Sequence, residues 1–334
     1  MKLACFGAGR IGGVHARNAA AHRDVILAAL VDPIDTPQRA ALAEQTGAKI
    51  SAAEDVFADD SIDGIIIASS TNSHAGLLEQ AAASGKAVFC EKPISLDFGL
   101  TAVVVDKVEA SGIPCMMGFQ RRYDASFLAA RQRIDSGISG PIEQLSMWSR
   151  DPSPPPRSYL ETSGGMFRDS TIHDADMLRF FLREEIASVY AVGASLISPD
   201  IGAAGDIDSL MVTVTTVSGR QGQITACRRG PMGYDQRLEA LCANEVLTIG
   251  NQPQSMLSVA CPTGGLQSPP ENYFIERFTQ AYRDEMAAFV AMIRDGIPPH
   301  AGIRDGYEAQ RLVEAAIVSA RTGQPIQYGK DWRP

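Results

Sequence analysis

The sequence has no segment that is apolar for long enough to span a bilayer, and it has no basic tract. Its first residues, "MKLACFGAGRIG", enter a strand-like run at once, without the charged, apolar and cleavage regions of a secretion signal. Lys and Arg are scattered and the formal net charge is −9, whereas binding to phosphate backbones needs clustered basic residues. These absences predict a cytoplasmic protein that binds neither a membrane nor a nucleic acid.

Cysteine and histidine are few, and neither recurs at a spacing that metal sites use. The six cysteines are far apart and lack CxxC spacing, and the five histidines do not pair at ligand spacing. We therefore expect reduced cysteines that serve packing, and we expect no metal site.

Short apolar runs alternate with helical patterns in the first third of the chain. The apolar runs lie at 2–6, 25–31, 64–69, 87–90 and 114–119. Strands that alternate with helices indicate βαβ units, and strands that are apolar throughout indicate a parallel sheet covered on both faces. This part predicts an α/β Rossmann domain with a doubly wound parallel sheet over residues 1–118.

The pattern changes after residue 118. Runs that alternate apolar and polar residues follow at 209–219, 220–230, 237–243 and 245–250. Such alternation is typical of antiparallel strands with one open face. Helical patterns lie at 174–185, 279–296 and 304–323. We expect an α+β C-terminal domain over residues 119–334, with a large, mostly antiparallel open sheet that carries helices on one side.

The stretch "FGAGRIG" follows the first strand directly and opens a helix. Gly7 would allow the tight turn, Gly9 would let the backbone approach a pyrophosphate, and Gly12 would let helix and strand pack closely. Asp32 ends the second strand at the distance along the chain expected of a carboxylate that binds ribose hydroxyls. The combination predicts a dinucleotide site.

Asp32 also bears on the choice of dinucleotide. A carboxylate at this position repels a 2′-phosphate, and the next residue is Pro33 rather than an arginine. Arg39 lies further along and is interpreted as a solvated helix residue rather than a phosphate clamp. The sequence therefore predicts NAD in preference to NADP.

A lysine follows the fourth clear strand in the stretch "FCEKPIS". Lys92 lies at the carboxyl edge of the expected parallel sheet, and that edge holds the ligand in doubly wound folds. The position predicts a functional lysine rather than a solvated one.

A second constellation lies in "SGGMFRDSTIHDADMLRFF". Asp169 and His173 are four residues apart in a helical pattern, so we expect their side chains to share one face. Asp174 and Asp176 point elsewhere in that pattern and are expected on a solvated face. His173 can take a proton near neutral pH, and Lys92 can stabilise a developing alkoxide, so these groups suit oxidation of a secondary alcohol.

Several motifs together resemble one family, that of glucose–fructose oxidoreductase, inositol dehydrogenase and the rhizopine-catabolism proteins. They are "GAGRIG", "EKP", "GFQRRYD", "SRDP", "SGGMFRDSTIHDADMLRFF" and "GYDQRLE", and they resemble the inositol 2-dehydrogenase branch most specifically. The likeness extends over essentially the whole chain, including "ERFTQAYRDEMAAFVAMIRDG" near the end.

The resemblance implies roles for individual residues. It implies a catalytic set of Lys92, Asp169 and His173. It implies NAD contacts from Gly7, Gly9, Arg10, Ile11, Gly12, Asp32, Ser69, Thr71, Asn72, His74, Glu91, Lys92 and Gln120. It implies substrate contacts from Lys92, Arg122, Asp151, Asp169, His173 and Tyr234, with the choice between Arg121 and Arg122 left open. It also implies a homo-oligomer, a dimer or tetramer formed through the C-terminal sheet.

The resemblance leaves the substrate open. The simplest expectation is oxidation of myo-inositol to scyllo-inosose with NAD. The segments "CRRGPMGYDQR" and "CANE" differ from the usual wording of the branch. Another inositol isomer, a sugar or an anhydrosugar is therefore an alternative substrate. A nucleotide-sensing regulator without catalysis is the alternative from another class.

Overall fold

A computed structural model describes residues 1–334, and the chain divides into two compact units. The first unit comprises Met1–Asp124 and Gln280–Glu308, and the second comprises Ala125–Thr279 and Ala309–Pro334. The division differs from the single break expected at residue 118, because a late segment of the chain returns to the first unit.

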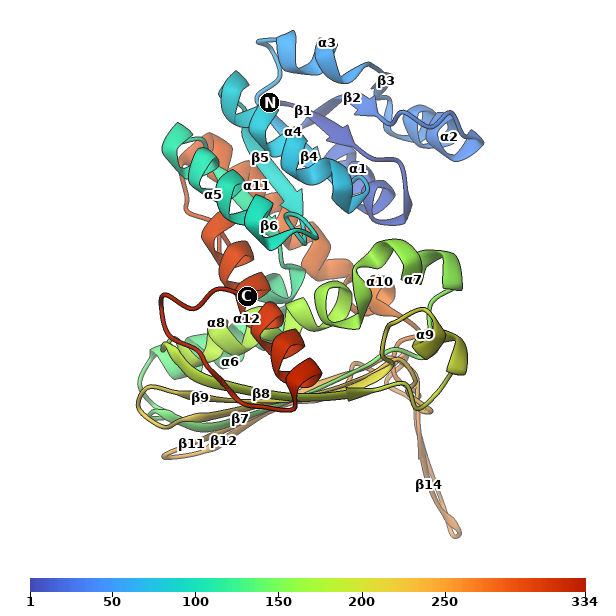
Figure 1. Cartoon of the computed structure of the whole chain (residues 1–334). Helices are drawn as coiled ribbons and strands as arrows, with labels where there is room; N and C mark the ends of the chain where they lie inside the picture. The colour runs from blue at the N-terminus through green and yellow to red at the C-terminus, as the bar shows by residue number, and fades with distance from the viewer. The chain divides into compact units, whose positions relative to one another are not determined.

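The first unit contains a parallel sheet with helices between successive strands (Figure 1). Its strands are β1 (Lys2–Phe6), β2 (Ile26–Val31), β3 (Lys49–Ile50), β4 (Gly64–Ile67), β5 (Ala87–Glu91) and β6 (Cys115–Gly118). Its helices are α1 (Arg10–Ala21), α2 (Pro37–Thr46), α3 (Ala53–Ala58), α4 (Thr71–Ser84), α5 (Phe98–Ser111), the 3-10 helix η1 (Gln120–Tyr123) and most of α11 (Thr279–Asp295). The strand order is β3-β2-β1-β4-β5-β6, and every pairing is parallel, which confirms the Rossmann prediction.

Local sequence explains where these helices end. Helices α2, α4 and α5 each stop at a glycine in the left-handed conformation, namely Gly47, Gly85 and Gly112. The reversals after α4 and α5 lead into the apolar strands β5 and β6, and β5 is buried along its whole length.

Helix α11 packs on the first sheet although it lies far along the sequence. Phe289 meets Phe89 of β5 with ring centroids 5.9 Å apart, and Met286 and Val290 belong to the same buried cluster. The helix was expected from its periodicity, but the sheet that it covers was not. An amphipathic pattern shows that one face is buried and does not say against what.

The second unit contains a seven-stranded sheet. The strands of this unit are β7 (Ile142–Arg150), β8 (Ile186–Ala194), β9 (Ser209–Thr216), β10 (Gln221–Cys227), β11 (Asp235–Cys242), β12 (Val246–Ile249), β13 (Ser258–Cys261), β14 (Gly264–Gln267) and β15 (Ile326–Gln327). The sheet order is β12-β11-β7-β10-β9-β8-β15, with β13 and β14 as a separate hairpin. All neighbours in the large sheet are antiparallel except β7 and β10, so the expected mostly antiparallel sheet is confirmed.

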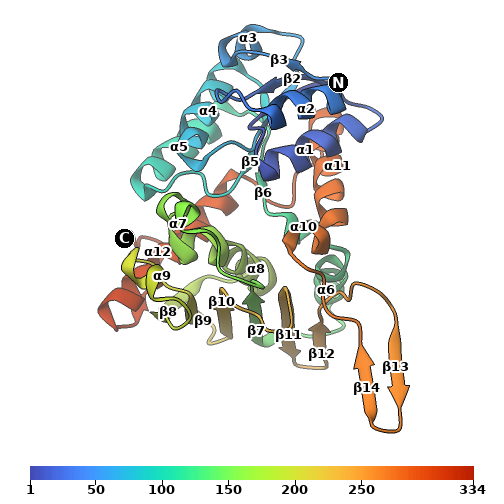
Figure 2. The same ribbon diagram turned by 90° about the vertical axis from the view of Figure 1, so that its right-hand side faces the viewer.

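Helices cover one face of this sheet, and the other face is open (Figure 1). The helices of this unit are α6 (Ala125–Asp135), α7 (Arg157–Ser163), the π-helix η2 (Phe167–Thr171), α8 (Ile172–Leu182), α9 (Pro199–Ala203), α10 (Phe274–Arg277) and the later part of α12 (Ile303–Thr322). The β13–β14 hairpin projects away from the large sheet (Figure 2). Cys261 of this hairpin is exposed, so it does not have the packing role expected of all six cysteines.

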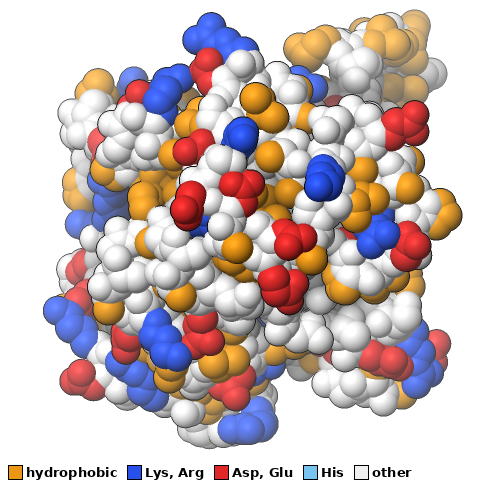
Figure 3. All heavy atoms as spheres, turned by 90° about the horizontal axis from the view of Figure 1, so that it is seen from above, with side chains coloured by type: hydrophobic (Ala, Val, Ile, Leu, Met, Phe, Trp, Pro, Cys, Tyr) orange, Lys and Arg blue, Asp and Glu red, His pale blue; other side chains and the backbone are white.

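No helix combines the length and apolarity needed to cross a membrane. On the face of the molecule shown in Figure 3, Lys and Arg alternate with Asp and Glu and form no broad basic area.

Candidate active site

The predicted dinucleotide residues lie along one edge of the first sheet. They follow the carboxyl ends of β1, β2, β4, β5 and β6. The sheet order reverses between β1 and β4, and ligands of doubly wound folds bind outside the strands at such a reversal.

The glycine turn between β1 and α1 is built for close approach. Gly7 has a φ of +106°, and a Cβ there would lie 2.4 Å from the Ala68 carbonyl oxygen. A Cβ on Gly12 would lie 2.2 Å from the Gly7 carbonyl oxygen. A Cβ on Gly9, by contrast, would meet nothing within 4 Å. The first and third glycines are therefore needed for packing, and the second leaves room above the turn.

Helix α1 begins directly after Gly9 without a side-chain cap and without an acidic residue in its first turn. Its first N–H groups and the positive end of its dipole are therefore available to an anion. These features fit the pyrophosphate of a dinucleotide, with Arg10 and Ile11 as the first helical residues.

Asp32 connects the glycine turn to the end of β2. Its Oδ2 accepts from the Ala8 N–H at 2.8 Å, and its Oδ1 accepts from the Ile34 N–H at 2.9 Å. Each oxygen has a further lone pair that a ribose hydroxyl can use. Arg39 is not the solvated residue expected: it donates to the Asp32 carbonyl oxygen at 2.8 Å and to Asp35 at 2.6 Å, and its side chain is 15% exposed.

The loop after β4 resembles the glycine turn in its electrostatics. Helix α4 begins at Thr71, and its N-cap residue Ser70 makes no side-chain cap. Thr71 and Asn72 therefore lie beside uncapped N–H groups, as a site for an anion or a polar ligand requires. Ser69 makes a 2.6 Å hydroxyl contact with Ser73.

His74 is turned into the protein rather than toward solvent. Its Nδ1 lies 2.8 Å from the Pro93 carbonyl oxygen and its Nε2 lies 3.1 Å from the Ser69 carbonyl oxygen. Burial lowers the pKa of this imidazole. His74 thus joins the loop after β4 to the turn that contains Lys92, and this geometry indicates a tie between loops rather than a side chain that reaches a ligand.

Lys92 follows β5 at the same edge and is half-buried. Its N–H donates to the carboxylate of Glu91 at 3.3 Å. Gln120 lies just after the neighbouring strand β6 and is buried. Lys92, Glu91 and Gln120 therefore belong to adjacent strand ends, as the sequence predicts for residues that share a site.

The arginine pair in η1 is buried, and the structure gives Arg122 a definite partner. Its guanidinium pairs with Asp305 at 3.0 Å and donates to the His300 carbonyl oxygen. Arg121 is also buried. Arg122 thus ties the 300–305 segment to η1 within the first unit.

In the second unit, Asp169 and His173 lie where a π-helix passes into an α-helix. Asp169 is in η2, and His173 is in the first turn of α8. Tyr159 donates its hydroxyl to Asp169 Oδ1 at 2.9 Å. Arg168 forms two bonds to Glu314, at 2.5 and 2.6 Å, and so fixes the π-helix to α12. Single-turn π-helices occur often at functional sites.

The backbone just before η2 packs closely against Asp206. Gly165 has a φ of +83°, and a Cβ there would lie 2.9 Å from Asp206 Oδ1, which accepts from the Met166 N–H. Asp174 and Asp176 are each 1% exposed, so the expectation of a solvated face is wrong. The residue identity alone suggested solvent, but α8 is covered on this side as well.

Asp151 and Tyr234 lie at one end of the large sheet. Arg150 and Asp235 are register partners of β7 and β11, so their neighbours Asp151 and Tyr234 flank the same strand ends. The Asp151 N–H donates to the Cys227 carbonyl oxygen at 3.0 Å. Tyr234 is buried, with its ring 5.9 Å from that of Tyr273.

Two residues that contact predicted site residues were not identified from the sequence. Tyr159 lies in α7, directly after a proline-rich stretch, and nothing in the spacing connected it to Asp169. His15 lies inside the helical run "GVHARN" and contacts Glu91 at 2.7 Å. Its position on the buried face of α1 was the one available signal.

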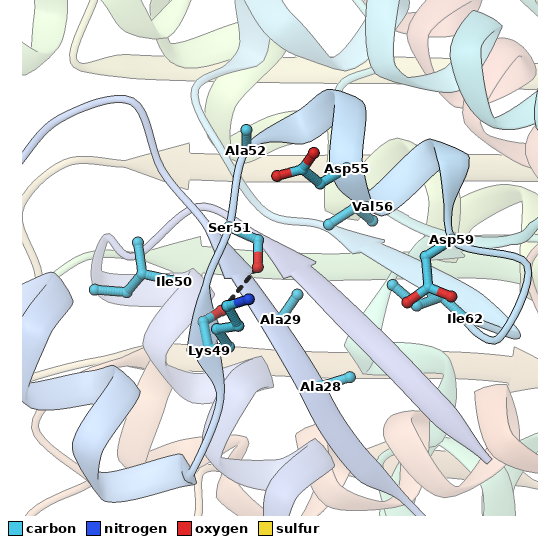
Figure 4. A pocket seen from close by; sticks show the side chains of 10 residues that line it. All are labelled: Ala28, Ala29, Lys49, Ile50, Ser51, Ala52, Asp55, Val56, Asp59 and Ile62. Atoms are coloured by element: carbon cyan, nitrogen blue, oxygen red, sulfur yellow. Dashed lines mark hydrogen bonds between the residues drawn. The ribbon is translucent and has the colours of Figure 1, made fainter.

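A shallow pocket lies elsewhere in the first unit, between β2, β3 and α3 (Figure 4). Lys49, Asp55 and Asp59 contribute polar side chains to its wall. None of the predicted site residues lines it, so it is separate from the dinucleotide edge.

By their chemistry, an open glycine turn and a carboxylate at the end of β2 are typical of a dinucleotide-dependent oxidoreductase. Known proteins narrow this class. The chain belongs to the GFO/IDH/MocA oxidoreductase family: residues 1–119 match the model described as "Oxidoreductase family, NAD-binding Rossmann fold", and residues 127–248 match the "GFO/IDH/MocA C-terminal domain".

Relatives with established names match over nearly the whole chain. Inositol 2-dehydrogenase from Rhizobium meliloti is 40% identical over 98% of both chains. The crystal structure of a myo-inositol dehydrogenase from Corynebacterium glutamicum has a TM-score of 0.93, with 39% identity, and covers 98% of this chain and 99% of that chain. Scyllo-inositol dehydrogenase from Lactobacillus casei, with bound NAD(H) and scyllo-inositol, has a TM-score of 0.89, with 26% identity, and covers 98% and 99%.

The predictions of family, enzyme class and cofactor are therefore confirmed. The chain is an oxidoreductase and its cofactor is NAD.

Proposed function

We propose that this protein oxidises one ring hydroxyl of a cyclic polyol with NAD, and that the substrate is myo-inositol, which would become scyllo-inosose. The observation that carries this proposal is full-length similarity at 40% identity to an inositol 2-dehydrogenase, together with the acid–histidine pair in η2 and α8. Since the Lactobacillus casei relative is described with scyllo-inositol, another isomer is the second candidate.

Each member of the catalytic set has a distinct task in this proposal. NAD, when bound, supplies the hydride acceptor. The His173 imidazole takes the hydroxyl proton as the C–H bond breaks, and Asp169 holds the ring in the orientation that accepts it. The Lys92 ammonium stabilises the alkoxide charge that develops on the same oxygen. No metal has a part in this scheme.

The substrate contacts are proposals of the same kind. Asp151 and Tyr234 would bind polyol hydroxyls, together with one arginine of the pair Arg121 and Arg122. The carboxylate of Asp151 can accept two hydroxyl donors, which suits vicinal alcohols.

We also propose that the chain forms a homo-oligomer through the open face of the large sheet. Val192 and Met211 are register partners on that face and are 46% and 50% exposed. Apolar side chains that lie together on a sheet face are typical of a contact surface.

The first test is NADH formation by purified protein with myo-, scyllo- and D-chiro-inositol, glucose, xylose and levoglucosan, each with NAD and with NADP. Turnover of myo-inositol with NAD is the expected result. Lys92→Ala and His173→Ala should each lower kcat on the order of a hundredfold, with the Kd for NADH kept. Activity on a different polyol would change the substrate and keep the mechanism. Tight NAD binding without turnover of any polyol would favour the nucleotide-sensing regulator.

A further inference from the structure

The carboxylate that precedes Lys92 is buried and bonded on both of its oxygens. Glu91 Oε1 lies 2.7 Å from His15 Nε2, and Glu91 Oε2 accepts from the Lys92 N–H at 3.3 Å. The Glu91 side chain is 10% exposed and that of His15 is 0% exposed. One carboxylate therefore joins α1, which starts at the glycine turn, to the backbone of Lys92.

The neighbouring strand has a glycine beside Glu91, where a side chain would clash with the carboxylate. Gly118 of β6 is the register partner of Glu91. A Cβ on Gly118 would lie 2.9 Å from Glu91 Cδ and 3.0 Å from Oε2. The carboxylate thus lies flat on the Gly118 backbone, and any larger residue would displace it.

Packing alone does not account for an imidazole at position 15. The His15 ring lies 4.7 Å from the Phe89 ring and 5.7 Å from the Tyr282 ring, between centroids, in an apolar setting. Its Nδ1 is buried without a hydrogen-bond partner, so its bond to Glu91 is the polar contact that this ring makes. An apolar side chain would fill the same space without leaving a buried nitrogen unpaired.

A second buried acid lies near enough to Glu91 to feel its charge. Glu285 of α11 is 0% exposed, and neither of its carboxyl oxygens has a hydrogen-bond partner. Burial, and next the charge of Glu91, raises the pKa of Glu285 well above its ordinary value. Burial thus favours the neutral form of Glu285, whereas Glu91 is paired with His15.

The other side of Lys92 is fixed as well. His74 Nδ1 contacts the carbonyl oxygen of Pro93, the next residue, at 2.8 Å. The backbone around Lys92 is thus held at its own N–H by Glu91 and one residue later by His74.

We infer that His15 and Glu91 are positioning residues that couple the helix of the glycine turn to Lys92. They place the lysine in register with a coenzyme seated at the N-terminus of that helix. The inference rests on the proposed function, because it takes Lys92 as the group that meets the substrate oxygen. The position of Lys92 matters for the rate, since displacing a catalytic group by about 1 Å can lower the rate on the order of a hundredfold.

The test compares His15→Gln with His15→Leu. Gln can donate an N–H to Glu91, and Leu fills the apolar space without a donor. The Leu variant should lower kcat about tenfold or more, with the KM for the polyol and the Kd for NADH within about threefold of wild type. The Gln variant should recover most of the rate. A residue that served packing alone would give the opposite order, because Leu suits the apolar surroundings better.

Gly118→Ala provides a second variant that removes no polar group. It should displace the Glu91 carboxylate and reproduce the loss of kcat seen with His15→Leu. Thermal unfolding of each variant shows that it is folded. Equal kcat for the Gln and Leu variants, both folded, would overturn the inference. Lys92→Ala separates this outcome from failure of the proposed function, since full turnover without the lysine would refute the lysine's role itself.

Discussion

At the scale of single residues, Asp32 shapes the glycine turn, and we expect it also to set the choice of coenzyme. Its carboxylate receives the N–H groups of Ala8 and Ile34, and so shapes the loop that would contact a ribose. Asp32→Ala should narrow the preference for NAD over NADP about tenfold or more, because a 2′-phosphate then meets no carboxylate and Arg39 lies close by. The ratio of kcat/KM with NAD to kcat/KM with NADP measures this preference.

Asp35→Ala is the matched control for this substitution. Asp35 is 88% exposed and pairs with the same arginine, but it does not touch the glycine turn. It should leave the coenzyme preference within about twofold, since an exposed ion pair contributes little. The same shift in both variants would mean that the ribose contact lies elsewhere.

The buried acid Glu285 makes stability depend on pH. In the unfolded chain this carboxyl ionises above its ordinary pKa of 4.5, whereas in the folded chain burial raises the pKa and keeps it protonated. Unfolding therefore releases a proton in that range and becomes easier as the pH rises, by about 1.4 kcal/mol per pH unit until the folded-state pKa is reached. Glu285→Gln removes this loss.

We expect the Tm of Glu285→Gln to exceed that of wild type, with a difference that grows from about pH 5 to about pH 7. Thermal melts at intervals of about one pH unit measure this difference. Glu44→Gln, on the exposed surface of α2, is the control and should show no such trend. A constant difference across pH would mean that Glu285 is ionised in the folded chain.

At the scale of helices and strands, the sequence predicted what local patterns encode. The apolar runs of β1, β2, β4, β5 and β6 marked the Rossmann sheet, and the glycine turn marked the start of α1. Strand β8 was not predicted. Its sequence is "IASVYAVGA", and its outer face carries Tyr190 and Val192. Because apolar residues lie on both faces, the alternation of apolar and polar residues that marks a half-exposed strand is absent.

The candidate site, like the fold, was predictable only where local patterns encode it. Residues at strand ends could be placed, since parallel strands bring their carboxyl ends to one edge. The ties made by His74 and Arg122, and the π-helix at Asp169, depend on long-range contacts that no local pattern encodes.

The π-helix gives a prediction at this scale through Gly165. Gly165→Ala would force a φ of +83° on a residue with a Cβ, and would set that Cβ 2.9 Å from Asp206 Oδ1. We expect a loss of about 1–2 kcal/mol of stability from the backbone, and a further loss from the clash. Lower kcat should accompany it, because the turn before Asp169 shifts.

Gly205→Ala separates the two effects. Gly205 has a φ of +76°, but a Cβ there would meet nothing within 4 Å. This control should carry the backbone cost alone and keep kcat. Denaturant unfolding and steady-state rates of both variants make the comparison. Equal stability and equal kcat in the two variants would show that Asp206 moves aside freely.

At the scale of the whole molecule, the open face of the large sheet differs from an ordinary solvent-exposed face. Across β8, β9, β10 and β7, one row of register partners on it consists of Val192, Met211, Thr225 and Trp148. Arg237 of β11 continues the row and stacks over Trp148 at 5.1 Å. A row with one charge among five side chains is typical of a surface that another chain covers.

Met211→Glu should therefore shift the protein to smaller species, because a buried carboxylate without a partner costs several kcal/mol in each copy of a symmetric contact. Light scattering after size exclusion measures the mass. Val103→Glu, on the exposed side of α5 and 49% exposed, is the control and should leave the mass unchanged. If the wild-type chain is a monomer at every concentration, the open face has no partner copy. If Met211→Glu keeps the wild-type mass, the contact lies on another surface. Loss of assembly in Met211→Glu alone would assign the contact to the face that the helices leave bare.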